Sequence, residues 1–249
     1  MANWSFFADW HTHTCYSDGK GSIAANARAG QVRSLQQVAI TDHAPASLGV
    51  GLKQPEVTLQ QMRTEIEAWN KTEVTPQLLL GAETNIISQQ GDLDLPKRLL
   101  KDLDVVIASL HPLVKPLTLK DGVSMLLPNL VQRYTPLRSR KLRNINTKAM
   151  VEAVYRYPID FVAHPGLWID IDTLELANAC VRRGTALEIN CRHTDILAGY
   201  VQAAMPTGVD FVISSDAHEP SLVGDLDAGL ELARRLQLPL ERIRNLMKG

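Results

Sequence analysis

The sequence has few cysteines, little net charge and no long apolar run. Its three cysteines, Cys15, Cys180 and Cys191, lack zinc-finger spacing, and their odd number favours a reducing compartment. A formal net charge of −1 gives no overall field that would attract nucleic acid or an anionic membrane. No apolar stretch is long enough to span a bilayer, and the N-terminal segment lacks the basic region of a signal peptide. We therefore expect a cytoplasmic protein with no membrane partner.

Seven short apolar segments alternate with longer amphipathic ones along the 249 residues. Segments of four to six residues rich in Val, Ile, Leu, Phe and Ala are typical of strands buried on both faces. The predicted strands are Ser5–Trp10, Gln37–Thr41, Leu78–Ala82, Val105–Ser109, Ile159–Ala163, Ala186–Ile189 and Phe211–Ser214. The predicted helices are Ser22–Val32, Glu56–Asn70, Leu95–Leu103, Lys148–Arg156, Thr173–Arg183, Ile196–Met205, Leu222–Leu236 and Leu240–Lys248.

This alternation continues without a break in composition, which favours one closed α/β barrel over two domains. An open, doubly wound sheet is the structural alternative. The stretch from about 112 to 146 interrupts the alternation, because it is far longer than an ordinary loop after a strand. It carries seven basic residues against the single acid Asp121, so it is either a basic lid or a solvated loop. The basic residues are Lys115, Lys120, Arg133, Arg138, Arg140, Lys141 and Arg143.

Histidines gather where the predicted strands end. A single histidine is more readily explained as a capping or surface residue than as a ligand, but six of the seven follow strand ends, which meet at one face of a barrel. Carboxylates occupy the same positions, and burying so many ionisable groups together is costly unless cations neutralise them. Imidazole with carboxylate suits Zn, Mn or Fe, so the pattern predicts a site for more than one ion. The six histidines are His11, His13, His43, His111, His164 and His218, and the carboxylates are Asp18, Glu83 and Asp216.

Ordered motifs at these positions resemble a known family. The segments DWHTHTCYSDG, AITDH, GAETN, SLHP, VAHPG, LEIN and SSDAH run from Asp9 towards Leu246 and are similar to the motifs of the PHP superfamily, named for polymerase and histidinol phosphatase. The resemblance is closest to stand-alone YcdX-type phosphatases and to PHP domains of family X DNA polymerases. It implies one PHP domain over residues 1–249, folded as a distorted (β/α)7 barrel, with a long basic insertion at about 112–146.

The resemblance also implies a centre of three divalent ions, as Zn, Mn or Fe with Mg possible. The first ion would be bound by His11, His13, Glu83 and Asp216, with Glu83 bridging to a second ion at His111 and His164. The third would be bound by Asp18, His43 and His218.

These features predict a hydrolase that removes phosphate from a small phosphomonoester with a metal-activated hydroxide. Arg192 is the predicted phosphate contact, or else a surface residue paired with Asp195, while His193 or His218 would assist proton transfer. Asn190 and Asp42 are expected to orient ligands. The alternatives are a phosphodiesterase or exonuclease on nucleotides or DNA ends, which the near-neutral charge disfavours, and a non-catalytic metal-binding regulatory module. The expected partner is a small phosphorylated substrate, and a homo-oligomer is possible.

Overall fold

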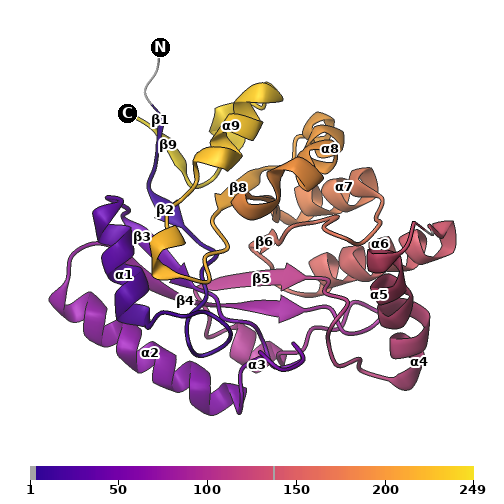
Figure 1. Cartoon of the computed structure of the whole chain (residues 1–249), viewed down its shortest axis with the longest axis horizontal. Helices are drawn as coiled ribbons and strands as arrows, with labels where there is room; N and C mark the ends of the chain where they lie inside the picture. Colours follow the sequence, from indigo (N-terminus) through magenta and orange to yellow (C-terminus); the bar gives the residue numbers. More distant parts are fainter. Residues whose placement is uncertain (1–3, 137) are drawn as a thin grey trace.

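A computed structural model describes residues 4–136 and 138–249. Seven parallel strands form one sheet in sequence order, each neighbouring the next along the chain (Figure 1). They are β2 (Ala8–Asp9), β3 (Gln37–Ile40), β4 (Gln77–Asn85), β5 (Val105–Ser109), β6 (Phe161–Val162), β7 (Ala186–Asn190) and β8 (Phe211–Ser214). Helices cover the sheet, so the predicted (β/α)7 barrel is confirmed.

The barrel is nearly closed where its last strand returns to its first. Beyond the strands proper, Thr12 and Ala217 form a parallel bridge, in which His13 N–H donates to the Ala217 carbonyl at 2.8 Å. The buried Asp9 carboxylate reinforces this seam by accepting hydrogen bonds from the Ser215 hydroxyl at 2.5 Å and from Gly224 N–H at 2.8 Å. This closure brings the segments after β2 and β8 together.

Six longer helices pack around the strands, and three of them begin at a capping side chain. They are α1 (Ile23–Val32), α2 (Pro55–Thr72), α6 (Arg140–Arg156), α7 (Thr173–Arg183), α8 (Thr194–Ala204) and α9 (Asp227–Arg235). The side chains of Ser22, Ser139 and Asp172 accept hydrogen bonds from the first turns of α1, α6 and α7. Gly184 ends α7 with a φ of +68°, a conformation that costs glycine little. None of the described helices is long and apolar enough to cross a membrane.

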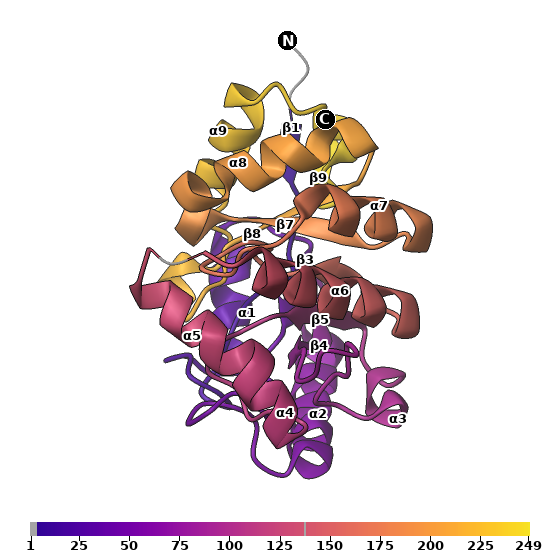
Figure 2. The same ribbon diagram turned by 90° about the vertical axis from the view of Figure 1, so that its right-hand side faces the viewer.

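The other helical segments are shorter. They are α3 (Lys97–Leu100), α4 (Leu119–Asp121), the π-helix η1 (Gly122–Leu126), α5 (Leu127–Tyr134) and the 3-10 helices η2 (Cys191–His193), η3 (Met205–Thr207), η4 (Pro220–Leu222) and η5 (Leu240–Arg242). The segment 112–146 is thus largely helical and not a loop: α4, η1 and α5 form one continuous rod, and α6 begins eight residues before the predicted start at Lys148. Figure 2 shows this rod as the outermost layer on its side of the barrel.

The prediction of a helix over Leu240–Lys248 is wrong. Only Leu240–Arg242 is helical, and Leu246–Lys248 forms strand β9, which pairs antiparallel with β1 (Trp4–Phe6). The predicted strand Ser5–Trp10 is correspondingly divided into β1 and β2. Long-range pairing of the two ends overrides the local helical pattern, because the ladder satisfies backbone groups that neither end could pair alone.

Candidate metal centre

The six histidines and three carboxylates predicted at strand ends converge on one face of the barrel. They lie near the carboxyl ends of six strands, β2, β3, β4, β5, β6 and β8, and the face lies above a small apolar cluster built from alternate residues of β3, β5, β6, β7 and β8. The Phe161 ring of that cluster lies 6.4 Å from the His11 ring, so the apolar interior forms the floor of the site. We call these nine residues the histidine cluster: His11, His13, Asp18, His43, Glu83, His111, His164, Asp216 and His218.

The first group within the cluster contains His11, His13, Glu83 and Asp216. Glu83 Oε2 lies 3.6 Å from His11 Nε2 and 3.8 Å from His13 Nε2. Asp216 Oδ1 lies 3.7 and 3.3 Å from the same two nitrogens. Two ligands held at about 2.1 Å from one tetrahedral ion lie about 3.4 Å from each other. The separations are therefore those of ligands around a common ion.

The second group uses the other oxygen of Glu83. Glu83 Oε1 lies 3.4 Å from His111 Nε2 and 3.0 Å from His164 Nε2. His43 lies on the other side of this carboxylate, because its Nδ1 is 2.7 Å from Glu83 Oε2, the oxygen that faces the first group. Glu83 thus contacts both groups from a single buried carboxylate, which is the placement a bridging ligand requires.

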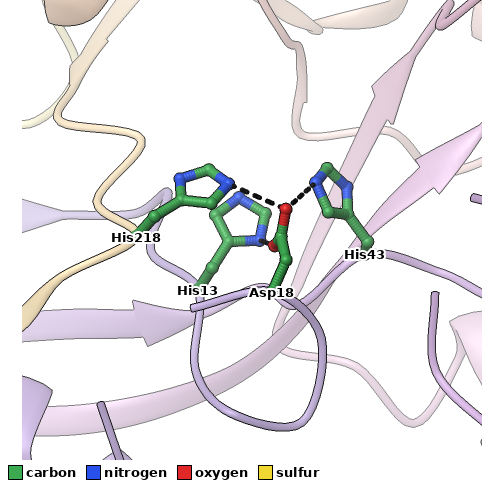
Figure 3. A group of neighbouring side chains, drawn as sticks. All are labelled: His13, Asp18, His43 and His218. Carbon is green, nitrogen blue, oxygen red and sulfur yellow. Dashed lines mark ion pairs between the residues drawn. The ribbon is translucent and has the colours of Figure 1, made fainter. Parts of the chain in front are cut away.

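The third group surrounds Asp18 (Figure 3). Asp18 Oδ2 lies 3.6 Å from His43 Nε2 and 3.3 Å from His218 Nε2, and Asp18 Oδ1 lies 3.9 Å from His13 Nδ1. Figure 3 shows the three imidazoles arranged around the carboxylate. Ligand atoms of all four residues lie within 4.8 Å of one another. The structure therefore places His13 between the first group and the third.

Burial and unpaired polar atoms test whether cations fit this donor set. Five buried atoms of the cluster make no hydrogen bond among the described residues and have only ion-pair contacts at 2.7–3.9 Å: His11 Nε2, both ring nitrogens of His13, His43 Nδ1 and Glu83 Oε2. A buried polar atom without a partner costs about 1–3 kcal/mol, and more where the group is charged. Bound divalent ions would satisfy these atoms, so the residues present fit metal.

The pKa shifts of His13, His111 and Asp18 favour the protonation state that binds metal, whereas the carboxylates around His11, His43, His164 and His218 outweigh burial and raise the pKa of those rings. Burial, aided by the charge on His43, lowers the pKa of His13 to about 4, and burial lowers that of His111 to about 3. Burial raises the pKa of Asp18, but the hydrogen bond from His218 and nearby imidazole charges outweigh it and lower the pKa to about 2. Neutral imidazole and ionised carboxylate are the forms that bind divalent cations.

Glu188 is one residue of the site that the sequence analysis missed. Its Oε1 lies 2.6 Å from His11 Nδ1, and its Oε2 accepts a hydrogen bond from the His164 backbone N–H at 2.6 Å. The ring nitrogen of His11 that faces Glu83 and Asp216 is the opposite one, so Glu188 fixes the ring with Nε2 towards the site. A carboxylate in the middle of the apolar strand LEIN was the available signal.

Further polar residues hold the ligands in place. Asp42 accepts hydrogen bonds from Thr14 N–H at 2.8 Å and from the Ser17 hydroxyl at 2.5 Å, which fixes the loop that carries Asp18. Asn190 Nδ2 donates to Asp216 Oδ2 at 3.1 Å. The expected orienting contacts of Asp42 and Asn190 are therefore present.

His111 has a similar support, which the sequence analysis did not identify. Asn85 Oδ1 lies 2.9 Å from His111 Nδ1, and Asn85 Nδ2 donates to the half-buried Asp94 carboxylate at 2.7 Å. The chain of contacts from Asp94 through Asn85 orients the His111 ring with Nε2 towards Glu83.

Backbone strain is concentrated at the same face. His164 has a φ of +29° and Asp216 a φ of +51°, in the left-handed region that residues other than glycine rarely adopt. Such residues cost of order 1–3 kcal/mol each and persist where surrounding contacts hold them. The Glu188 bond to His164 N–H and the Asn190 bond to Asp216 supply those contacts.

A cavity of about 220 Å³ opens onto the cluster, and Arg192 and His193 line it. Arg192 Nη1 donates to the Asp216 carbonyl at 3.2 Å and lies 2.8 Å from His218 Nδ1, so its guanidinium faces the site. None of the ion pairs among the described residues joins Arg192 to Asp195.

His193 occupies the cavity wall and belongs to none of the metal-binding groups formed by the described residues. Its ring packs edge-on against Trp168 at 5.4 Å, and the Arg133 guanidinium lies 4.0 Å from the Trp168 ring centre. Arg133 belongs to α5, so one basic residue of the 112–146 segment reaches the cavity wall. Arg143 of the same segment instead pairs with Asp172, 3.0 Å away.

Comparison with known proteins agrees with this geometry. The chain is 31% identical over 95% of its length to a protein of Caldanaerobacter subterraneus subsp. tengcongensis named as a probable phosphatase, of which it covers 86%. It is 30% identical over 91% of its length to the DNA polymerase/3'-5' exonuclease PolX of Bacillus subtilis, of which it covers 37%. Its fold is similar to that of the histidinol phosphate phosphatase of Lactococcus lactis, with a TM-score of 0.59, 14% identity, and coverage of 92% of this chain and 93% of that one.

A family model described as the PHP domain matches residues 9–169. That stretch includes seven of the nine residues of the histidine cluster, all except Asp216 and His218. The prediction of a hydrolase acting on phosphate esters is confirmed at the level of this family. The chain belongs to the PHP domain family.

Proposed function

We propose that this protein hydrolyses a small phosphomonoester at a centre of three divalent ions. The observation that carries the proposal is the set of three adjoining His/carboxylate groups, with buried polar atoms that make no hydrogen bond among the described residues. The first group would hold one ion, the Glu83 Oε1 side a second, and the Asp18 group a third. Zn, Mn and Fe suit these ligands, with Mg possible. Adjacent divalent ions lower the pKa of bound water and neutralise phosphate oxygens.

The residues around the ions bind and orient the substrate. Arg192 lies at the edge of the cluster with its guanidinium towards His218, where its planar donors can bind a phosphate oxygen. His218 and His193 are the candidates for moving a proton to the leaving group, because both line the cavity. His193 fits this role better, since His218 Nε2 faces Asp18 in the third metal group.

The size of the cavity supports a small substrate. Its volume of about 220 Å³ is below the usual range of sites for drug-sized ligands, about 300–1,000 Å³. Leu110, Leu167 and Trp168 provide apolar surface beside the ligands, where the organic part of a phosphomonoester can lie. We place this activity in the cytoplasm, because free cysteines persist there.

A second candidate is hydrolysis of phosphodiesters at nucleotides or DNA ends. The similarity to the Bacillus subtilis DNA polymerase/3'-5' exonuclease favours it, although the chain spans little more than a third of that protein. The two candidates differ in the group that must leave the phosphorus and in the room needed beside it. A diester must place a second organic group against the cavity wall.

Hydrolysis of p-nitrophenyl phosphate and of bis(p-nitrophenyl) phosphate by protein reconstituted with Zn or Mn separates the candidates. We expect turnover of the monoester to exceed that of the diester by at least tenfold, with metal content near three ions per chain. The reverse preference would establish the second candidate. A fully metallated protein that turns over neither ester would instead be a binding module, and the proposal would fail.

His13→Ala tests the site itself, because His13 contacts two of the three groups. We expect loss of metal with an unchanged circular dichroism spectrum. The matched control is Cys15→Ala, two residues away on an exposed side chain, which should keep its metal. Unchanged metal content in His13→Ala would contradict the assignment.

A further inference from the structure

The cavity over the histidine cluster has two chemically different ends. At one end lie side chains of the cluster, and among the described residues that line the cavity its carboxylates, Glu83 and Asp216, are the only acidic groups. The other end is mainly apolar. We call its four apolar residues the apolar wall: Leu110, Pro112, Leu167 and Trp168. A phosphate held by ions at the cluster therefore leaves the organic part of its ester facing the apolar wall.

Trp168 differs from the other residues of this wall. Leu110 and Leu167 are buried, whereas Trp168 is 39% exposed and is the largest of the four side chains. Its φ of +58° lies in the left-handed region, which costs free energy for any residue other than glycine. Strained residues of this kind persist where surrounding contacts hold them, and they are concentrated at functional sites. The chain thus keeps a large aromatic surface beside the cluster at an energetic cost.

A tight turn fixes Trp168 relative to the cluster. The turn starts at His164 of the cluster, whose carbonyl accepts a hydrogen bond from Leu167 N–H at 3.0 Å. Gly166 within it has a φ of +94°, and a Cβ at this position would lie 2.4 Å from the Tyr200 ring of α8. The turn therefore packs closely against α8. Its backbone sets the position of the indole ring relative to the imidazole of His164.

Two side chains from other elements hold the indole ring. The Arg133 guanidinium of α5 lies 4.0 Å from the ring centre, a distance at which it covers one face of the ring. The His193 ring of η2 packs against Trp168 at 5.4 Å and an angle of 68°. Arg133 is not among the described residues that line the cavity, so it covers the ring from outside. The part of the indole that lines the cavity remains available to a ligand.

The chemistry of this end favours one class of organic group. An aromatic ring packs against an indole with an offset or edge to face, and such pairs are favourable beyond the area that they bury. The hydroxyls of a sugar would lose water against the apolar wall without gaining acceptors. Outside the histidine cluster, Arg192 and His193 are the only polar groups among the described lining residues, and neither is a carboxylate or an amide.

We infer that Trp168 is a specificity-determining residue, which selects phosphomonoesters whose phosphate is bonded to a planar aromatic group over esters of sugars and other polyols. The inference rests on the proposed function, because it assigns the organic part of that substrate. It predicts that the indole ring contributes to the affinity for the leaving group and not to the affinity of the ions for phosphate.

Binding of phosphonates to the metallated protein tests the inference without a chemical step, because the carbon–phosphorus bond replaces the ester bond. Phenylphosphonate and cyclohexylphosphonate carry rings of similar size, of which only the first is planar and aromatic. We expect calorimetric titration, at a pH where both are dianions, to show about three- to tenfold tighter binding of phenylphosphonate. Equal affinities, or a preference for cyclohexylphosphonate, would overturn the inference.

Variants at position 168 assign this preference to the indole ring. Trp168→Leu should reduce the ratio of the two affinities to about one, and Trp168→Phe should keep a preference for phenylphosphonate. The matched control is Tyr155→Leu, because Tyr155 is 41% exposed on α6 and does not line the cavity. It should keep the wild-type ratio. A wild-type ratio in Trp168→Leu would contradict the role of Trp168.

Tryptophan fluorescence locates the ligand if Trp168→Leu fails to fold. The chain has four tryptophans, so Trp168→Phe removes one emitter and keeps an aromatic ring in the wall. Saturating phenylphosphonate should change the emission of the wild-type protein and leave that of Trp168→Phe unchanged. An equal change in both proteins would place the phenyl ring away from Trp168 and overturn the inference.

Titration with inorganic phosphate distinguishes failure of this inference from failure of the proposed function. A metallated protein that binds phosphate but does not distinguish the two phosphonates would keep the proposed function and lose the inference. A metallated protein that binds neither phosphate nor phosphonate would lose both.

Discussion

The histidine cluster and the rod of α4, η1 and α5 depart from the usual distribution of residues in opposite ways. In the cluster, charged and polar side chains are buried, and several of their atoms make no hydrogen bond. On the rod, Leu119, Val123, Leu127 and Val131 are exposed to solvent, while Asp121 and Asn129 are buried. Each departure costs free energy in the isolated chain. The chemistry of the buried donors indicates a cation at the cluster, whereas the apolar row of the rod indicates no particular ligand.

Removing the Glu83 charge should have the largest effect on metal content and on kcat/KM. Glu83→Gln keeps the size of the side chain but removes the charge that contacts two metal groups. We expect loss of more than one ion per chain and a fall in kcat/KM of about a thousandfold, about 4 kcal/mol of transition-state stabilisation. Metal analysis and steady-state kinetics measure both. Wild-type metal content in this variant would show that the buried charges are balanced without ions.

Glu188 acts through His11, so its removal should affect metal binding and activity less than the removal of the Glu83 charge. Losing an outer partner of a metal-binding histidine typically lowers metal affinity by about 10–100-fold. We expect Glu188→Gln to lower the metal affinity by about 10–100-fold, measured by competition titration with a chelator. Its activity at saturating metal should fall by a smaller factor. Glu67→Gln, on the exposed face of α2, is the matched control. Equal affinity in Glu188→Gln and wild type would mean that His11 is oriented by packing alone.

The Asn129–Asn146 pair tests whether polar contacts hold the rod with its apolar residues Val123, Leu127 and Val131 outward. Asn129→Ala leaves Asn146 with one partner fewer in a buried position, and we expect a loss of about 1–3 kcal/mol in the free energy of unfolding. Replacing both residues with alanine should cost less than the sum of the two single changes, because each single change already removes both hydrogen bonds between the amides. Denaturant titrations of Asn129→Ala, Asn146→Ala and the double variant give the coupling energy.

The control for this series is Asn144→Ala, on the exposed face of α6. Independent, additive losses at positions 129 and 146 would show that the two amides do not act as a pair.

The sequence predicts the barrel well because each strand can be predicted from its own residues. The compositions of Val105–Ser109 and Phe211–Ser214 are themselves typical of buried strands, and both segments are strands with these bounds. The ends of the chain are different. Leu246–Lys248 becomes a strand only because Trp4–Phe6 lies beside it, and no local pattern contains that pairing.

The same distinction separates the parts of the site. The histidines could be found because they follow strand ends, whereas Glu188 acts on His11, which lies 177 residues away and reaches it only across the closed barrel. The rod of α4, η1 and α5 was not predicted, because the positions of its apolar residues do not by themselves show which side of the helix is buried. Its orientation depends on Asn146 of the next helix.

Arg133 connects the two regions, and its removal should have the smallest effect. A guanidinium over an indole ring contributes about 0.5–1 kcal/mol at an exposed site, and Trp168 is held with a φ of +58° in the cavity wall. We expect Arg133→Met to raise KM about two- to fivefold with kcat unchanged, since the wall contacts substrate and not the reacting atoms. Arg28→Met, exposed on α1, should leave both constants unchanged. If Arg133→Met lowered kcat instead, Arg133 would act on the chemistry, and the 112–146 segment would belong to the metal site as well as to the outer surface.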